Sequence, residues 1–294
     1  MASTNIPRPR VACEVSVEQV VAARAADKAR TLESAAVRSV PAGALAPGIQ
    51  QANVVAREPI VTALREALSS VAGRSRDVVL IIPDATTRIM LLEFDTLPEK
   101  PEDAEGVVRF RLKKSLPFDV DQSAISFDRH VTGEGLRVIA AVTPRTVLEE
   151  YESAVREAGF NPGTVLPSMI AALGAVDASR PTMVIKVESG TTTFAIADQN
   201  QLLLYRALEN GGATVTGESL VDDVNTSLVY FEDRYSVMIE RLLVSGVQSG
   251  QALQAAFSDR SVKVEDLVST SAAGAAVTDV SRSALAGVAG ALVS

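Results

Sequence analysis

The sequence is poor in the residue types from which many sites are built. Among its 294 residues there is one cysteine, Cys13, one histidine, His130, and no tryptophan. A single cysteine excludes an intrachain disulfide, and one Cys with one His excludes a Cys/His zinc site. No Ser/His/Asp arrangement can be built on His130, which we expect to be a structural or surface residue. We therefore expect neither a metal site nor a catalytic residue.

Basic charge and long hydrophobic runs are also lacking. Acidic residues outnumber basic ones by 36 to 28, a net charge of −8, so no general attraction to nucleic acid is expected. No stretch reaches the roughly 18 uncharged apolar residues of a membrane-spanning helix, and "MASTNIPRPR" lacks a signal core. We expect a cytoplasmic protein with no direct membrane insertion. The tail "SALAGVAGALVS" predicts a packed terminal helix, with an interfacial membrane helix as the alternative.

What is present suits a large globular protein, because 47% of the residues are apolar and 22% are charged. The length suggests two domains or one bilobal unit. Two stretches share a pattern of apolar run, acidic turn and second apolar run: "VACEVSVEQVVAAR" at 11–24 and "VIKVESGTTTFAIAD" at 184–198. Together they suggest a duplicated domain led by a β-hairpin.

Other elements follow from periodicity and turn residues. Residues 144–158 form the clearest helix, which Thr143 can cap and Gly159 can end. Further helices are predicted at 58–71, 103–115, 218–232 and 251–257, and strands at 78–82, 88–94, 125–131, 136–142 and 241–244.

Taken together, these pieces resemble the actin-like fold, and within it the PilM family of type IV pilus assembly. The resemblance covers nearly the whole chain. Its most specific part is "LPEKPEDAEGVVRFRLKKSLPFDVDQSAISFDRH" followed by "LRVIAAVTPRTVLEEYESAVREAGFNPGTVLPSMIAAL", which look like the inserted PilM subdomain. The ends "SVPAGALAPGIQQANVV" and "SRSALAGVAGALVS" are similar to family segments as well.

The resemblance implies an α/β, actin-like (ribonuclease H-like) fold of two lobes with a small inserted α/β subdomain. The second lobe is expected to be reduced, because Gly212 reaches the next helix almost at once, and the chain to be a divergent, shortened member. The expected units are a first lobe (1–77, completed by about 168–180 and the terminal helix 278–294), the insert (78–167) and a second lobe (181–277).

Actin-like ATPases hold nucleotide with two Asp-x-Gly hairpins and a Gly-Gly turn, and this chain departs from each signature. The first reads Glu14-Val15-Ser16, and the family's lysine falls on or near Val21. The second is either Glu188-Ser189-Gly190 or, in the other register, Val187-Glu188-Ser189. The third has Val247 after Gly246. The residues that would bind nucleotide, if binding is retained, are Glu14, Ser16, Glu188, Ser189, Gly190, Thr191 and Gly246.

These departures predict weakened nucleotide binding. Valine is poorly suited to positions where backbone must approach phosphate closely or adopt positive φ. Glutamate in place of aspartate moves the carboxylate by one methylene, which the octahedral shell of Mg²⁺ tolerates badly. We therefore expect no cofactor and little or no hydrolysis, and the alternative is a working cleft with ATP and Mg²⁺.

The strip "RFRLKKSLPF" suggests a binding surface on the insert. In the PilM family, a groove between the insert and the first lobe receives the cytoplasmic N-terminal peptide of PilN, an inner-membrane protein. Such capture needs an apolar floor and polar partners. The residues that the resemblance assigns to the groove are Phe110, Arg111, Lys113, Lys114, Pro117 and Phe118. The alternative is a helix whose charged side faces water.

The resulting prediction is a cytoplasmic scaffold of a type IV pilus or related secretion machine, held at the inner membrane by a PilN-like protein. Self-assembly is a further expectation. One alternative is a divergent ATP-dependent switch. The other is the actin-like cytoplasmic component of type II secretion, a family that normally continues into a membrane helix.

Overall fold

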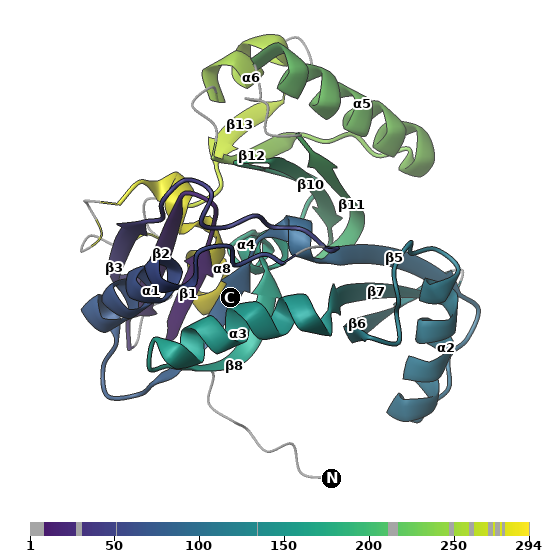
Figure 1. Cartoon of the computed structure of the whole chain (residues 1–294). Helices are drawn as coiled ribbons and strands as arrows, with labels where there is room; N and C mark the ends of the chain where they lie inside the picture. Colours follow the sequence, from purple (N-terminus) through teal and green to yellow (C-terminus); the bar gives the residue numbers. More distant parts are fainter. Residues whose placement is uncertain are drawn as a thin grey trace.

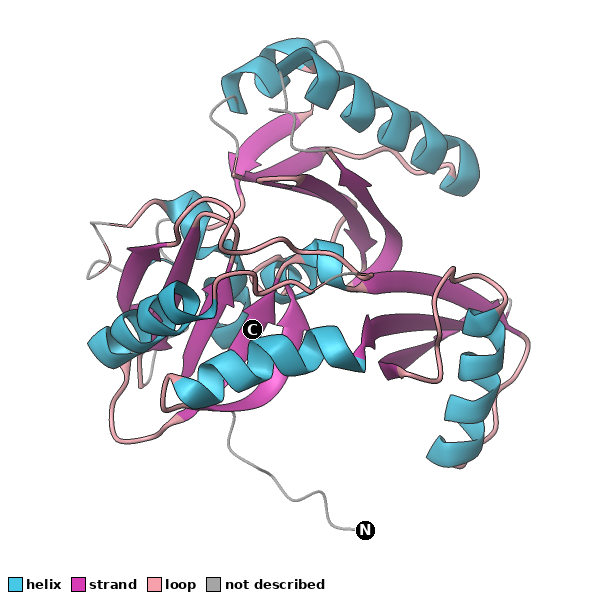
Figure 2. Cartoon of the chain, in the orientation of Figure 1, coloured by secondary structure: helices cyan, strands magenta, loops and turns pink. Residues whose placement is uncertain are grey.

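The computed structural model describes residues 9–27, 31–50, 52–133, 135–210, 217–246, 250–258, 262–269, 273, 277 and 280–293. Its strands form two five-stranded sheets and one three-stranded sheet. The two larger sheets lie in two lobes, and the three-stranded sheet projects beside them as a separate unit (Figure 1, Figure 2).

The first lobe is built on a sheet with strand order β3-β2-β1-β4-β8. Helices α1 and α3 cover one face of this sheet, and their apolar stripes, which include Leu64, Leu68 and Tyr151, fill the core between helices and strands. The elements are β1 (Val11–Val15), β2 (Gln19–Ala25), β3 (Leu32–Ser39), α1 (Arg57–Val71), β4 (Asp77–Ile82), α3 (Arg145–Glu157) and β8 (Asn161–Pro167).

The second lobe repeats the plan, with strand order β11-β10-β9-β12-β13. In both sheets three antiparallel strands are followed by two parallel ones, which confirms the duplicated hairpin-led domain. The Gly211-Gly212 turn lies outside the described residues. The elements are β9 (Thr182–Glu188), β10 (Thr191–Asp198), β11 (Gln201–Glu209), α5 (Gly217–Tyr235), β12 (Arg241–Ser245), α6 (Gly250–Ala256) and β13 (Lys263–Asp266).

Two short helices pack against each other where the lobes meet, α4 (Ser168–Leu173) and α8 (Ala286–Val293), the latter preceded by η3 (Arg282–Leu285). Their residues join apolar side chains of both large sheets in one core. A Cβ on Gly290 would overlap the carbonyl oxygen of Ala171, so glycine permits this close approach. The C-terminal segment is thus a packed helix, as the sequence predicts.

The projecting unit consists of β5 (Arg88–Phe94), α2 (Pro101–Lys113), β6 (Ser123–Thr132) and β7 (Gly135–Pro144), joined to β4 by the short helix η1 (Asp84–Thr86). Helix α2 packs on one face of its sheet. The expected insert boundaries of 78–167 are too wide, because β4 and β8 pair within the first-lobe sheet. A continuous apolar run such as "VVLII" fits any buried strand and does not say which sheet it joins.

The expected cap of α3 is also different. The N-cap position is Pro144, and Thr143 does not cap the helix. The hydroxyl of Thr143 instead lies 2.8 Å from that of Thr87, within the polar contact that ties β7 to the start of β5.

Candidate functional site

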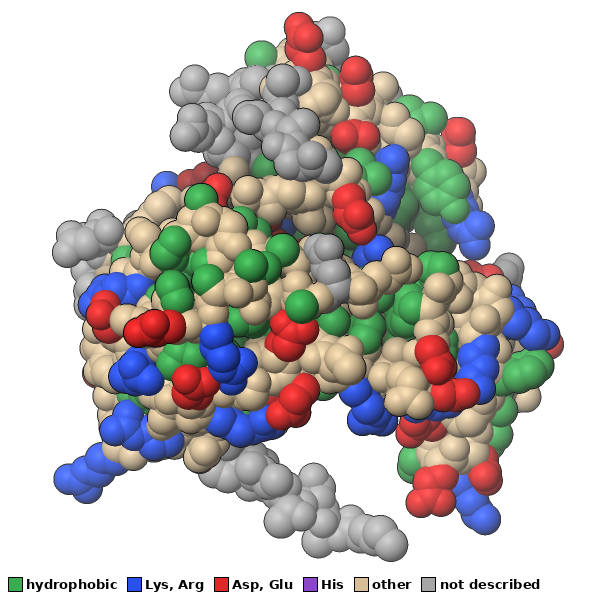
Figure 3. Space-filling view, viewed as in Figure 1, with side chains coloured by type: hydrophobic (Ala, Val, Ile, Leu, Met, Phe, Trp, Pro, Cys, Tyr) green, Lys and Arg blue, Asp and Glu red, His purple; other side chains and the backbone are tan. Residues whose placement is uncertain are grey.

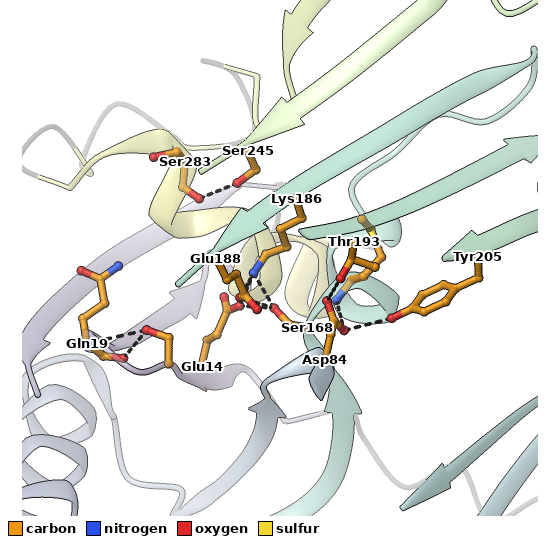
Figure 4. Close-up of polar contacts among 12 residues, drawn as sticks. Glu14, Gln19, Asp84, Ser168, Lys186, Glu188, Thr193, Tyr205, Ser245 and Ser283 are labelled. Carbon is orange, nitrogen blue, oxygen red and sulfur yellow. Dashed lines mark hydrogen bonds and ion pairs between the residues drawn. The ribbon is translucent and has the colours of Figure 1, made fainter. Parts of the chain in front are cut away.

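The polar residues of the candidate site come from the ends of equivalent strands in the two lobes. Because successive side chains alternate along a strand, Glu14 lies on the same face of β1 as Ala12, and Lys186 and Glu188 lie on the same face of β9 as Val184. Ala12 and Val184 belong to the core between the lobes. The three charged side chains therefore point into the junction and meet there (Figure 4).

Lys186 stands at the centre of this group. Its Nζ lies 2.8 Å from Glu14 Oε1 and is also paired with Glu188 Oε1. The side chains of Lys186, Glu14 and Glu188 are 6%, 7% and 16% exposed. We call these residues, together with Ser168, the Lys186 cluster.

Ser168 completes the Lys186 cluster from the first turn of α4. Its hydroxyl donates toward the carboxylates, with a separation of 3.0 Å from Glu188 Oε1, and it accepts from the ammonium of Lys186. Burial alone would lower the pKa of Lys186, but the charges of the carboxylates, Glu14 first, raise it above its usual value. The ammonium therefore stays charged and shared between the two acids.

A glycine lets Glu14 occupy its position. A Cβ on Gly287, in α8, would overlap both carboxylate oxygens of Glu14. The buried acid thus lies directly against the backbone of the C-terminal helix. Any side chain at position 287 would have to displace the carboxylate or the helix.

Asp84 forms a second polar centre beside the Lys186 cluster, at the carboxyl end of β4. Its Oδ1 accepts hydrogen bonds from the backbone N–H of Met169 at 2.9 Å and from the Tyr205 hydroxyl at 3.1 Å. Its Oδ2 accepts from the Thr193 hydroxyl at 3.0 Å. Burial raises the pKa of Asp84 to about 7, and the negative charge of Glu188 adds to that effect. The Asp84 centre therefore joins η1 and α4 to two strands of the second lobe.

The turns expected to cradle phosphate have internal contacts. The Ser16 hydroxyl donates to the carbonyl of Gln19 at 2.9 Å and closes the first hairpin. Glu188 pairs with Thr191 across a two-residue turn, in which Ser189 is exposed and Gly190 has φ +89°. Gly190 thus adopts a conformation that other residues rarely accept.

The third turn is described only in part, since Val247 lies outside the described residues. Gly246 has φ +77°, and a Cβ there would overlap the carbonyl oxygen of Val187. The close approach of β12 to β9 therefore accounts for glycine at this position without a nucleotide.

The residues of the predicted peptide groove lie on and just after α2, at the far side of the insert from α1 and β3 (Figure 1). Phe110 is 61% exposed, with Lys114 over its ring, and Lys113 is paired with Asp121. Phe118 packs against the core beneath α2. Arg111 and Pro117 are exposed. Most residues of this strip, 110–118, therefore lie on the outer surface of the insert, while Leu112 is buried in its core.

A surface hollow lies closer to the junction of insert and first lobe. It has a volume of about 610 Å³ and is lined by Arg57, Arg145, Thr146, Glu149, Glu150 and Ser153. We call it the α3 hollow. At its edge, the Glu150 carboxylate of α3 accepts hydrogen bonds from the backbone N–H groups of Asn53 and Val54 at 2.7 and 2.8 Å. These bonds tie α3 to the segment that precedes α1. Figure 3 shows an open notch below the junction of the first lobe and the insert.

Lys186, Ser168, Asp84 and Tyr205 were not identified from the sequence. Lys186 did carry a signal: it is the one charge inside the run "TMVIKVE" before Glu188, and two charges spaced by two residues share a strand face. Asp84 follows a buried parallel strand, at the sheet edge where open α/β sheets place their ligands. Ser168 carried no such signal.

By sequence, the chain matches no protein-family model and no curated protein. Its structure does match solved ones. A chain of the "PilM-PilN type IV pilus biogenesis complex" superimposes with a TM-score of 0.77 at 17% identity, covering 98% of both chains. The chain has a PilM-like, actin-like fold.

Two further structures are similar at lower scores. The cytoplasmic domain of EpsL, an inner-membrane component of the type II secretion system of Vibrio cholerae, gives a TM-score of 0.53 at 12% identity, covering 89% of this chain and 98% of that one. A Bacteroides thetaiotaomicron protein of actin-like ATPase fold and unknown function gives 0.53 at 11% identity, covering 90% and 91%. These likenesses confirm the expected fold class.

Within the described residues, no helix is long and apolar enough to cross a membrane. In the same part of the chain, no three His, Cys, Asp or Glu side chains are placed to hold a metal ion.

Proposed function

We propose that the chain is a PilM-type cytoplasmic scaffold of a type IV pilus or related secretion machine. It binds the cytoplasmic N-terminal peptide of a PilN-like inner-membrane protein and is held at the membrane through that partner. The observation that carries the proposal is the fold match to the PilM-PilN complex over 98% of both chains, because that match includes the insert as well as both lobes.

The Lys186 cluster supports a scaffold without ATP turnover. Mg²⁺ binds through free carboxylates and substrate phosphates in a near-octahedral shell. Here the acids of both hairpins are already paired with one ammonium and are largely buried. Binding Mg-ATP would require Lys186 to leave both acids, which leaves charges unpaired during the exchange.

The α3 hollow is a candidate for the peptide groove because of its position. It lies on the first lobe where α3 follows the last strand of the insert, and it offers both cationic and anionic side chains to an extended peptide. The strip 110–118 is the other candidate, with Phe110 as its exposed apolar residue.

The two surfaces can be separated with charge-reversing and polar variants. Titration calorimetry would use a synthetic peptide of the cytoplasmic N-terminal residues of a PilN-like protein from the same genome. Arg145→Glu is expected to weaken binding at least tenfold, a change of about 1.4 kcal/mol, while Phe110→Asp leaves it unchanged. The reverse result would place the groove on α2. If the wild-type protein binds no such peptide, the proposed function is wrong.

A second candidate is an ATP-dependent switch, and one observation favours it. The lysine that the sequence lacks near Val21 is supplied from the opposite hairpin by Lys186, whose ammonium could approach phosphate if the lobes moved apart. Phosphate release measured with Mg-ATP tests this: turnover that Lys186→Ala abolishes would support the switch. The structural similarity to the cytoplasmic domain of EpsL has a lower TM-score. It supports a third candidate function, a component of type II secretion.

A further inference from the structure

Polar contacts between the two lobes gather at two adjacent buried points. Lys186 of β9 contacts Glu14 of β1 and Ser168 of α4. Next to it, Asp84 accepts hydrogen bonds from Thr193 and Tyr205 across the same junction. Figure 4 shows both groups between the sheets, with side chains entering from each lobe.

Glu14 shares the ammonium of Lys186 only while the lobes are together, because Lys186 and Glu188 both belong to β9 of the second lobe. When one partner of a buried ion pair is removed, the other is left unpaired at low dielectric, and this is strongly destabilising. Without its ammonium, Glu14 and Glu188 would face each other as like charges. Separation of the lobes would weaken this repulsion, because water then reaches both carboxylates.

The hydrogen bonds of the Asp84 centre also favour the state in which the lobes are together. Two of its three donors are hydroxyls of the second lobe, and its third is the backbone of α4. Separating the lobes would remove both hydroxyl donors from a residue that is 1% exposed.

We infer that the Lys186 cluster and the Asp84 centre form a built-in latch that keeps the two lobes closed without a ligand between them. The Lys186 cluster lies at the ends of the two hairpins to which the resemblance assigns nucleotide binding. This inference does not depend on which partner the scaffold binds, so a failed peptide-binding test would leave it unaffected.

Distances between the lobes, measured by pulsed electron paramagnetic resonance, test the latch. Ser69 on α1 and Asn225 on α5 are both exposed and serve as label sites after S69C and N225C substitution. The natural thiol does not interfere, because Cys13 is fully buried and burial raises its pKa to about 12. The doubly labelled protein without nucleotide is expected to show one narrow distance that Mg-ATP does not change.

Lys186→Met is expected to shift this distance to longer values and to broaden its distribution. The matched control is Lys263→Met, which removes an exposed lysine paired with Glu265 on the second lobe and should leave the distance unchanged. Adding E14Q and E188Q to K186M removes the facing charges, so the triple variant is expected to return toward the wild-type distance. Packing damage alone would not be reversed in this way.

A second variant covers the case in which Lys186→Met fails to fold. Thr193→Val with Tyr205→Phe keeps nearly the same shape and removes both second-lobe donors to Asp84, so it is also expected to lengthen the distance. The latch is refuted if Lys186→Met and this double variant keep the wild-type distance, or if the double variant alone does so when Lys186→Met is unfolded. It is also refuted if the wild-type lobes close only when Mg-ATP is added.

Discussion

Replacing Asp84 by Asn should change how stability depends on pH. Burial raises the pKa of Asp84 from 3.8 to about 7, so between these values the folded protein holds a proton that the unfolded chain has lost. The free energy of unfolding must then fall as pH rises through this window. Asparagine does not titrate there, and its amide can still serve the hydrogen bonds of Met169, Tyr205 and Thr193.

The magnitude follows from the two pKa values. One proton changes the free energy of unfolding by at most about 1.4 kcal/mol per pH unit. From about pH 5 to about pH 7, the sum for this single group is about 2 kcal/mol. The stability of Asp84→Asn minus that of the wild type should therefore rise by about that amount, and then level off above the folded pKa.

Urea unfolding at several pH values from about 5 to 8 measures this difference directly, with equal m-values as the check that both proteins unfold alike. A difference that stays constant with pH would refute the raised pKa of Asp84 at the junction.

Two further predictions concern close packing and a buried amide. Gly287→Ala should lower the free energy of unfolding by about 1–3 kcal/mol, because the new Cβ overlaps the Glu14 carboxylate. The control Gly106→Ala, in open space on α2, should raise the free energy of unfolding by about 0.5–1 kcal/mol. Equal effects of the two substitutions in urea unfolding would contradict this prediction. Asn53→Ala should lower the free energy of unfolding by about 1–3 kcal/mol, because it removes the acceptor of the buried Tyr151 hydroxyl. It should also speed amide hydrogen exchange in residues 44–50 and 52–56. Unchanged exchange there would show that the Asn53 side chain does not stabilise this segment.

Much of the fold could be predicted because the patterns are local. The two hairpins at 11–25 and 182–198 are marked by paired apolar runs around an acidic turn, and the strands formed there. The limits of the insert could not be predicted in the same way. Residues 77–82 and 161–167 are strands in either arrangement, and only the pairing of β4 with β1, and of β8 with β4, shows that they belong to the first lobe.

The candidate site was predictable in part. Glu14 and Glu188 stand out as acids at hairpin ends, and the structure brings them to one ammonium. Lys186 lies 172 residues from Glu14 in the sequence, so their pairing depends on how the two lobes pack and not on any local pattern. The role of Ser168 could not be predicted for the same reason, because a serine at the start of a helix contacts Glu14 and Glu188 only after the chain has folded.

Calorimetric titration with Mg-ATP tests most directly the claim that internal charges have replaced a nucleotide between the lobes. We expect no binding heat at ATP concentrations up to about 1 mM, which corresponds to an affinity weaker than about −4 kcal/mol. Micromolar binding, accompanied by turnover that Glu14→Ala abolishes, would contradict it.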